Sequence, residues 1–201
     1  MAALQRAPEQ FLREMRICPT DPDLMLPAQD GWTDPVTGQP QKTRARLWLI
    51  RRGQKARPIL PADPQSSDHY GHEWWDRDGQ SVWYIDYQTG TRKVDLLIAR
   101  LQTIGPQGHT HSHCDASGRF VVGDIHTPPD AMWKIAFFDA ATRHQADIVP
   151  ELPSQPSPGH YHLQPHPQFC LQDQDVCYPT SVLGPVEVTL ILVRDGAAIS
   201  M

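Results

Sequence analysis

The pattern of apolar and polar positions changes along the chain and predicts mainly strands. Residues 1–16 carry a weak apolar stripe at helical spacing through Leu4, Phe11, Leu12 and Met15, so we expect at most a short helix there. A proline-rich loop region follows, and the first β-rich run is Arg46–Ile50. From residue 70 onward, short β-branched and aromatic runs alternate with turn residues, which is typical of strands joined by hairpins.

One pattern occurs three times after residue 70. Each copy has a histidine, a turn residue seven positions later and a β-rich strand after the turn: His72, Gly79 and 81–86; His111, Gly118 and 119–124; His166, Asp173 and 176–178. A further strand is expected in each copy, at 94–101, 132–138 and 186–193. The third copy is the weakest, because Asp173 stands where the other two copies have glycine, and the Asp-Gly pair of the first copy is lost.

The spacing of these copies predicts the fold class. The copies start near residues 72, 111 and 166, and the region from about 17 to 60 is a possible degraded fourth copy. A period of about 40 to 55 residues with three or four strands per repeat is typical of a β-propeller. We therefore predict an all-β partial β-propeller of about four blades, each of three to four antiparallel strands, over residues 17–201, after an N-terminal segment of residues 1–16. A β-sandwich is the alternative.

Composition and charge narrow the functions that fit. Twenty prolines in 201 residues leave little room for long helices. A net charge of -5 argues against a nucleic-acid partner, which needs a basic face. The apolar run 188–193 is far too short to span a membrane, and the N-terminus lacks a signal-peptide pattern, so we predict a cytoplasmic protein without a membrane partner. The four cysteines show no CxxC spacing and are expected to be buried free thiols.

The histidines carry the candidate chemistry. In a propeller the innermost strand of each blade lines a central channel, so His72, His111 and His166 are expected to converge. Two stretches also alternate with period two, and each set is expected on one strand face: His109, His111 and His113, and then His160, His162, Gln164 and His166.

Imidazoles on one face, with an amide oxygen as an additional ligand, suit a divalent metal such as Mn, Fe, Ni or Zn. A solvated, His-rich channel wall is the alternative. Arg46, next to the first clear strand, either projects into the same channel to hold a carboxylate or lies on the rim.

Four segments together resemble the oligogalacturonate lyase family. Gly71–Trp75 followed by Asp78-Gly79 is similar to the family's GHEFW…DG segment, and 18–25 (CPTDPDLM) is similar to HPTDPNL. Residues 164–169 (QPHPQF) resemble HPHPxF, and 46–48 (RLW) resemble the R-[IM]-W strand. The resemblance extends from about Arg16 to Arg194.

The resemblance implies a fold, an activity and a set of site residues. The family has a seven-bladed propeller of about twice this length and cleaves short pectin fragments, such as digalacturonate, by β-elimination to a 4-deoxy-5-keto-uronate. It holds one divalent metal, typically manganese, through three His and one Gln. Matched by motif, His72 is the candidate base and Arg46 the assisting arginine. His166 and either His111 or His113 are candidate ligands, with Gln164 as a further one.

The chain departs from the family in residues and in length. Cys18 stands where the family has His, and Gln164 stands at the first His of HPHP. Tyr161 falls near the place of the family's glutamine, so His162 is a possible replacement. Three explanations of the half length stay open: a truncated product, a homo-oligomer or second chain that completes the ring, or a degenerate propeller that binds a carbohydrate or protein without catalysis.

Overall fold

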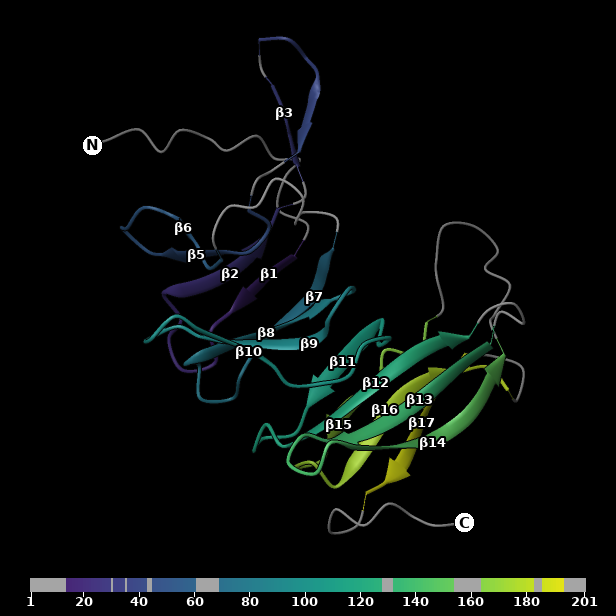
Figure 1. Cartoon of the computed structure of the whole chain (residues 1–201). Helices are drawn as coiled ribbons and strands as arrows, with labels where there is room; N and C mark the ends of the chain where they lie inside the picture. Colours follow the sequence, from purple (N-terminus) through teal and green to yellow (C-terminus); the bar gives the residue numbers. More distant parts are fainter. Residues whose placement is uncertain are drawn as a thin grey trace. The chain divides into compact units, whose positions relative to one another are not determined.

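The structure is a computed structural model that describes residues 14–29, 31–34, 36–42, 45–60, 69–127, 132–153, 164–182 and 186–193. Across these ranges the regular elements are all strands, and none is a helix (Figure 1). The all-β prediction is therefore confirmed. No helix in the described ranges has the length and apolar character needed to cross a membrane.

The strands form four antiparallel sheets and one small hairpin. The sheets run, in spatial order, β1-β2-β5-β6, β10-β9-β8-β7, β11-β12-β13-β14 and β15-β16-β17, and β3 pairs with β4. The bounds in the first sheet are β1 Glu14–Ile17, β2 Leu24–Ala28, β5 Trp48–Arg51 and β6 Arg57–Pro58, with β3 Gly31–Thr33 and β4 Pro40–Lys42 inserted between β2 and β5. In the second they are β7 Tyr70–Trp75, β8 Ser81–Asp86, β9 Gly90–Asp95 and β10 Arg100–Thr103.

The third and fourth sheets hold the remaining strands. Their bounds are β11 His111–Cys114, β12 Phe120–Thr127, β13 Met132–Asp139, β14 His144–Pro153, β15 Gln168–Cys170, β16 Asp175–Thr180 and β17 Glu187–Leu192. In three of the four sheets, neighbours in space are neighbours in sequence, which is the meander of a propeller blade. The predicted number of blades and of strands per blade is confirmed.

The chain divides into two compact units. The first contains Met1–Trp83 with Val94–Leu101, and the second contains Tyr84–Lys93 with Gln102–Met201. In the first unit, the stacked indoles of Trp74 and Trp83 lie 5.7 Å apart, and Trp83 Nε1 donates to Asp76 Oδ2. In the second, Val122, Ile135 and Val176 are fully buried at the centre of a cluster between the third and fourth sheets. Each unit thus has its own apolar core.

The predicted repeat is visible in the turns. Gly79, Gly118 and Asp173 have φ angles of 70°, 68° and 65°. The same left-handed conformation therefore recurs at the same repeat position, although only two of the three residues are glycine. Aspartate tolerates this region better than most side chains do.

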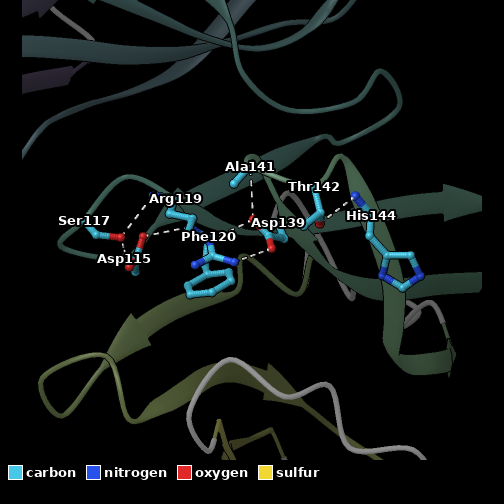
Figure 2. A network of polar contacts seen from close by, with 8 residues as sticks. All are labelled: Asp115, Ser117, Arg119, Phe120, Asp139, Ala141, Thr142 and His144. Carbon is cyan, nitrogen blue, oxygen red and sulfur yellow. Dashed lines mark hydrogen bonds and ion pairs between the residues drawn. The ribbon is translucent and has the colours of Figure 1, made fainter.

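A polar network closes the turn end of the third sheet (Figure 2). Arg119 Nε and Nη2 donate to the two oxygens of Asp139 at 3.0 and 2.7 Å. Asp139 also accepts from the backbone N–H of Ala141, and Asp115 accepts from that of Phe120. The guanidinium holds the pKa of the Asp139 carboxyl well below its ordinary value.

Two sequence predictions need correction. The expected helix lies mostly in residues 1–13, outside the described ranges, but Glu14–Arg16 belong to β1 and pair with β2, so the proposed boundary at residue 16 falls inside a strand. The strand expected at 94–101 is also wrong: β9 ends at Asp95, and β10 begins at Arg100. The Asp95 carboxylate accepts from the N–H groups of Leu97 and Ile98, which stabilises the turn between them.

Candidate metal centre

The imidazole of His111 is oriented by a buried carboxylate. His111 begins β11 and pairs in register with Asp124 of β12. Its backbone N–H donates to Asp124 Oδ1 at 2.8 Å, and its Nδ1 lies 2.8 Å from Oδ2. A carboxylate only accepts, so the hydrogen is on Nδ1 and the lone pair is on Nε2. Carboxylates that accept the ring N–H of a metal-ligating histidine, without touching the metal, fix the orientation of its ring in this way.

His166 is brought to the same carboxylate by the proline pair around it. Pro165 and Pro167 are buried, and His166 adopts a φ of 40°. Its backbone N–H donates to Asp124 Oδ2 at 3.0 Å. The imidazole rings of His111 and His166 have centroids only 3.4 Å apart. One fully buried aspartate thus positions two histidines that are 55 residues apart in the sequence.

The hydrogen bonds of Asp124 offset the cost of its burial. An isolated carboxylate in an apolar interior is strongly disfavoured. Asp124 has no exposed surface, but both of its oxygens accept N–H groups from His111 and His166. Charge-assisted bonds of this kind are roughly twice as strong as neutral ones. The carboxylate is therefore both a structural link between β12 and the segment before β15 and an orienting group.

His113 and His109 have different surroundings. The Nδ1 of His113 accepts the backbone N–H of Phe169 at 3.2 Å, so its lone pair is used within the fold. The prediction that His109 shares a strand face with them is wrong, because β11 begins only at His111. His109 is buried, its Nδ1 lies 3.0 Å from Ser112 Oγ, and burial lowers its pKa to about 4.

Gly123 explains how the His109 ring fits. A Cβ at this position would come within 2.3 Å of the His109 ring. The imidazole therefore packs directly on the backbone of β12, one residue before Asp124. His109 serves the structure of the second unit, and a glycine inside an apolar strand is the sequence signal of this close approach.

The first unit contains the two residues that were predicted to be catalytic, His72 and Arg46. His72 lies on β7, is half-buried and has a φ of 51°, a conformation that it shares with His166. The neighbouring Glu73 side chain is fully buried, and Arg46 Nη2 lies 4.0 Å from its Oε2. Only 13% of the Arg46 side chain is exposed, so Arg46 is not a rim residue. Its cationic head balances the buried Glu73 carboxylate.

The structure places the remaining candidates as follows. Gln164 is half-buried at the start of the segment that leads to β15. His160, Tyr161 and His162 lie outside the described residues. Cys18 is buried, and its Sγ lies 3.8 Å from the Gly79 carbonyl, at the turn end of β7 rather than at the end that carries His72. All four cysteines are free thiols, as predicted, but only Cys18 and Cys114 are buried, whereas Cys170 and Cys177 are half-buried.

The donor set fits a divalent metal. Imidazole nitrogens are borderline ligands that accept Mn, Fe, Ni or Zn, and the Asp124 carboxylate leaves the lone pair of His111 on Nε2. Sequence reasoning found both histidines of this arrangement but missed Asp124. A charged residue inside the apolar strand sequence FVVGDI was the available signal, since a buried charge needs partners.

No protein-family model matches the sequence, and no curated protein is significantly similar to it. Solved structures are similar in fold. One of them is an oligogalacturonate lyase in complex with manganese. The match has a TM-score of 0.73 at 20% sequence identity, and it covers 93% of this chain and 50% of the lyase chain. An oligogalacturonate lyase from Vibrio parahaemolyticus gives 0.71 at 19% identity, over 92% and 50%. TolB from Acinetobacter baumannii gives 0.59 at 12% identity, over 88% and 40%.

These similarities confirm the predicted propeller fold and the predicted structural resemblance. The chain spans about half the length of the two oligogalacturonate lyases. At identities of 20% and below, the likeness extends to the fold and not to the activity.

Proposed function

We propose that this chain forms part of a lyase that cleaves oligogalacturonides such as digalacturonate by metal-assisted β-elimination. The observation that carries the proposal is the His111–Asp124–His166 arrangement: one buried carboxylate orients the imidazole of His111 and accepts the backbone N–H of His166, and the centroids of the two imidazole rings lie 3.4 Å apart. It occurs in a chain whose fold is similar to that of a lyase solved with manganese.

We propose His111 and His166 as metal ligands, with Gln164 as a further ligand. His111 is preferred to His113, because the Nδ1 lone pair of His113 already accepts the Phe169 N–H. A bound Mn²⁺ would supply positive charge near the uronate carboxylate and so favour loss of the adjacent proton.

In the proposed reaction, His72 takes the C5 proton of the uronate. The electrons of the C5–H bond form the C4–C5 double bond, and the C4–O bond breaks, so the leaving sugar takes the electron pair and then a proton from solvent. A neutral imidazole is a suitable base near pH 7. The guanidinium of Arg46 would bind the substrate carboxylate in exchange for part of its attraction to Glu73.

A ligand role for His72 is the competing assignment. His72 occupies the same repeat position as the two proposed ligands, His111 and His166. His72 and His166 also share the left-handed backbone that their neighbours lack. Metal content separates the two roles, since loss of a base leaves the metal in place and loss of a ligand does not.

The test combines manganese titration with assay of the keto-uronate product by its thiobarbiturate colour. His111→Ala and His166→Ala are expected to weaken manganese binding about 100-fold or more, while His113→Ala and the exposed control His144→Ala stay within about twofold. His72→Ala is expected to keep the metal and lose the product. If the metal-loaded wild type yields no product, the chain is a non-catalytic propeller module that binds a carbohydrate or protein.

The partner and location remain predictions. We propose a small acidic oligosaccharide as the substrate, and a second chain or copy as the means of completing the ring. Val188, Leu190 and Leu192 of the edge strand β17 are 73%, 55% and 43% exposed, which is consistent with such a neighbour.

A further inference from the structure

Positive charge is concentrated in one part of this acidic chain. Residues 35–62 contain seven of its 18 Lys and Arg residues and none of its 23 Asp and Glu residues. The rest of the sequence therefore carries all of the negative charge. A local cationic surface in a chain with a net charge of -5 indicates an anionic ligand rather than a general polyanion partner.

The structure shows where three of these cations gather. An open cavity of about 370 Å³ in the first unit is lined by Arg51, Lys55 and Arg57 from β5, β6 and the turn between them. Its volume is within the range of small-molecule sites. Gly79 and Gln80 of the β7–β8 turn form another part of the wall. The cavity thus lies beyond the Trp75 end of β7, and His72 is three residues, or about 10 Å of strand, before that end.

The cations of the cavity differ in how they are paired. Arg51 Nη1 lies 2.6 Å from Asp21 Oδ2, so its charge is largely balanced. Lys55 and Arg57 are exposed, and neither has an ion-pair partner within the ranges that the structure describes. Two positive charges at the mouth of one cavity are therefore available to an incoming anion.

The other lining residues define the ligand further. Four leucines contribute an apolar wall, and two amide side chains lie among the cations: Leu24, Leu49, Leu96 and Leu97, with Gln54 and Gln80. Inorganic phosphate would leave the leucines exposed to water. A sugar acid matches all three chemistries, because it has a carbon face, hydroxyl groups and a carboxylate.

We propose that this cavity is a second binding site, separate from the histidines, for a carboxylate-bearing sugar. Lys55 and Arg57 bind the carboxylate, the glutamine amides bind hydroxyl groups, and the leucines pack on the carbon face. The choice of galacturonate as the sugar acid rests on the proposed function, whereas the site itself does not. This site would bind an acidic oligosaccharide on the first unit, and its residues would take no part in the cleavage.

The test is calorimetric titration of the full chain with digalacturonate in EDTA, so that no metal contributes. Lys55→Gln/Arg57→Gln is expected to weaken binding at least tenfold, because two charged contacts are lost. Arg52→Gln is the matched control: its side chain is 80% exposed, it carries the same charge and it does not line the cavity. We expect this control to stay within about twofold. Far-UV circular dichroism checks that each variant is folded.

Two further arms separate this site from its alternatives. His111→Ala is expected to retain digalacturonate binding in EDTA, so the proposed lyase activity can fail while this site stands. Leu97→Ser is expected to weaken the binding of digalacturonate. Neutral galactobiose is expected to bind to the wild type at least tenfold more weakly than digalacturonate does. The proposal is overturned if the wild type does not bind, if Arg52→Gln weakens binding as much as the double variant, if His111→Ala abolishes binding, or if galactobiose binds equally well.

Discussion

At the turn end of the three repeated hairpins, Gly79, Gly118 and Asp173 adopt the same left-handed backbone. Gly79 and Gly118 each donate their N–H to a carbonyl three residues earlier, whereas in the third turn Gln174 donates to the Leu171 carbonyl. At the other end, the three histidines of the shared repeat position have different surroundings. His111 is buried with its ring on Asp124, His166 is exposed with a left-handed backbone, and His72 is half-buried beside Glu73. The repeat therefore maintains the turns, while the candidate chemistry depends on partners that only one copy has.

The polar groups at the two ends also differ in what they leave available. At the turn end of the third sheet, the planar guanidinium of Arg119 takes both oxygens of Asp139. At the histidine end, Asp124 accepts the backbone N–H and the Nδ1–H of His111 and the backbone N–H of His166, so Nε2 of His111 keeps a lone pair. In the Arg119–Asp139 pair both carboxylate oxygens are bound by the guanidinium, whereas the Asp124–His111 pair leaves an imidazole nitrogen that can bind a ligand.

The largest expected effect is that of Asp124→Asn. An amide keeps the shape but replaces one acceptor oxygen with a donor, which opposes the N–H groups of His111 and His166. We expect unfolding free energy to fall by about 2–4 kcal/mol, and manganese affinity to fall 10- to 100-fold. Urea unfolding and manganese titration measure the two effects.

Asp139→Asn, on the same sheet but at the turn end, is the matched control for metal binding. It should leave the manganese affinity unchanged. If Asp124→Asn bound manganese as well as the wild type does, the two ends would not differ in the way described here.

The next effect concerns the turn end itself. A Cβ at Gly79 would lie 2.2 Å from Thr20 Oγ1 and 2.6 Å from Cys18 Sγ, in addition to the strain of its φ. We expect Gly79→Ala to reduce the unfolding free energy by about 2–3 kcal/mol, since overpacking adds to the backbone cost. Gly53, with a φ of 76° and no neighbour within 4 Å, carries the backbone cost alone, so Gly53→Ala should cost about 1 kcal/mol.

Equal losses in the two glycine variants, measured by urea unfolding, would contradict the packing argument. They would show that the turn is maintained only by local conformation, and that the contact of Cys18 and Thr20 with this turn has little influence on stability.

The same contrast explains what the sequence could predict. The turns at Gly79 and Gly118 follow from local chemistry, because a left-handed position favours glycine wherever it occurs. The spacing then located Asp173 as their equivalent. Asp124 could not be found in this way, since its role depends on strand register with His111 and on a backbone bond from a residue 42 positions away.

The histidine pattern shows the same limit in a different form. Alternation placed His109 with His111, but the strand begins two residues later, and the His109 ring packs on Gly123. Where a strand starts is decided by its pairing partner, β12, and not by the alternation of side chains. The cationic cavity was missed because its lining residues come from separate segments of the first unit.

The smallest expected effect tests the ion pair between Arg119 and Asp139 at the turn end of the third sheet. Bonds from Arg119 hold the pKa of Asp139 below its ordinary value of 3.8, so the folded chain binds fewer protons than the unfolded chain as the pH falls through this range. The contribution is therefore fully present above about pH 5 and is lost on acidification.

Asp139→Asn should lower the urea midpoint at about pH 7, and the difference from the wild type should shrink between about pH 4 and pH 2. Half of the Arg119 side chain is exposed to solvent, so added salt should also reduce the difference at neutral pH. Equal urea midpoints of the two proteins at neutral pH would instead assign the role of Asp139 to its bond with the Ala141 N–H, which asparagine can also accept.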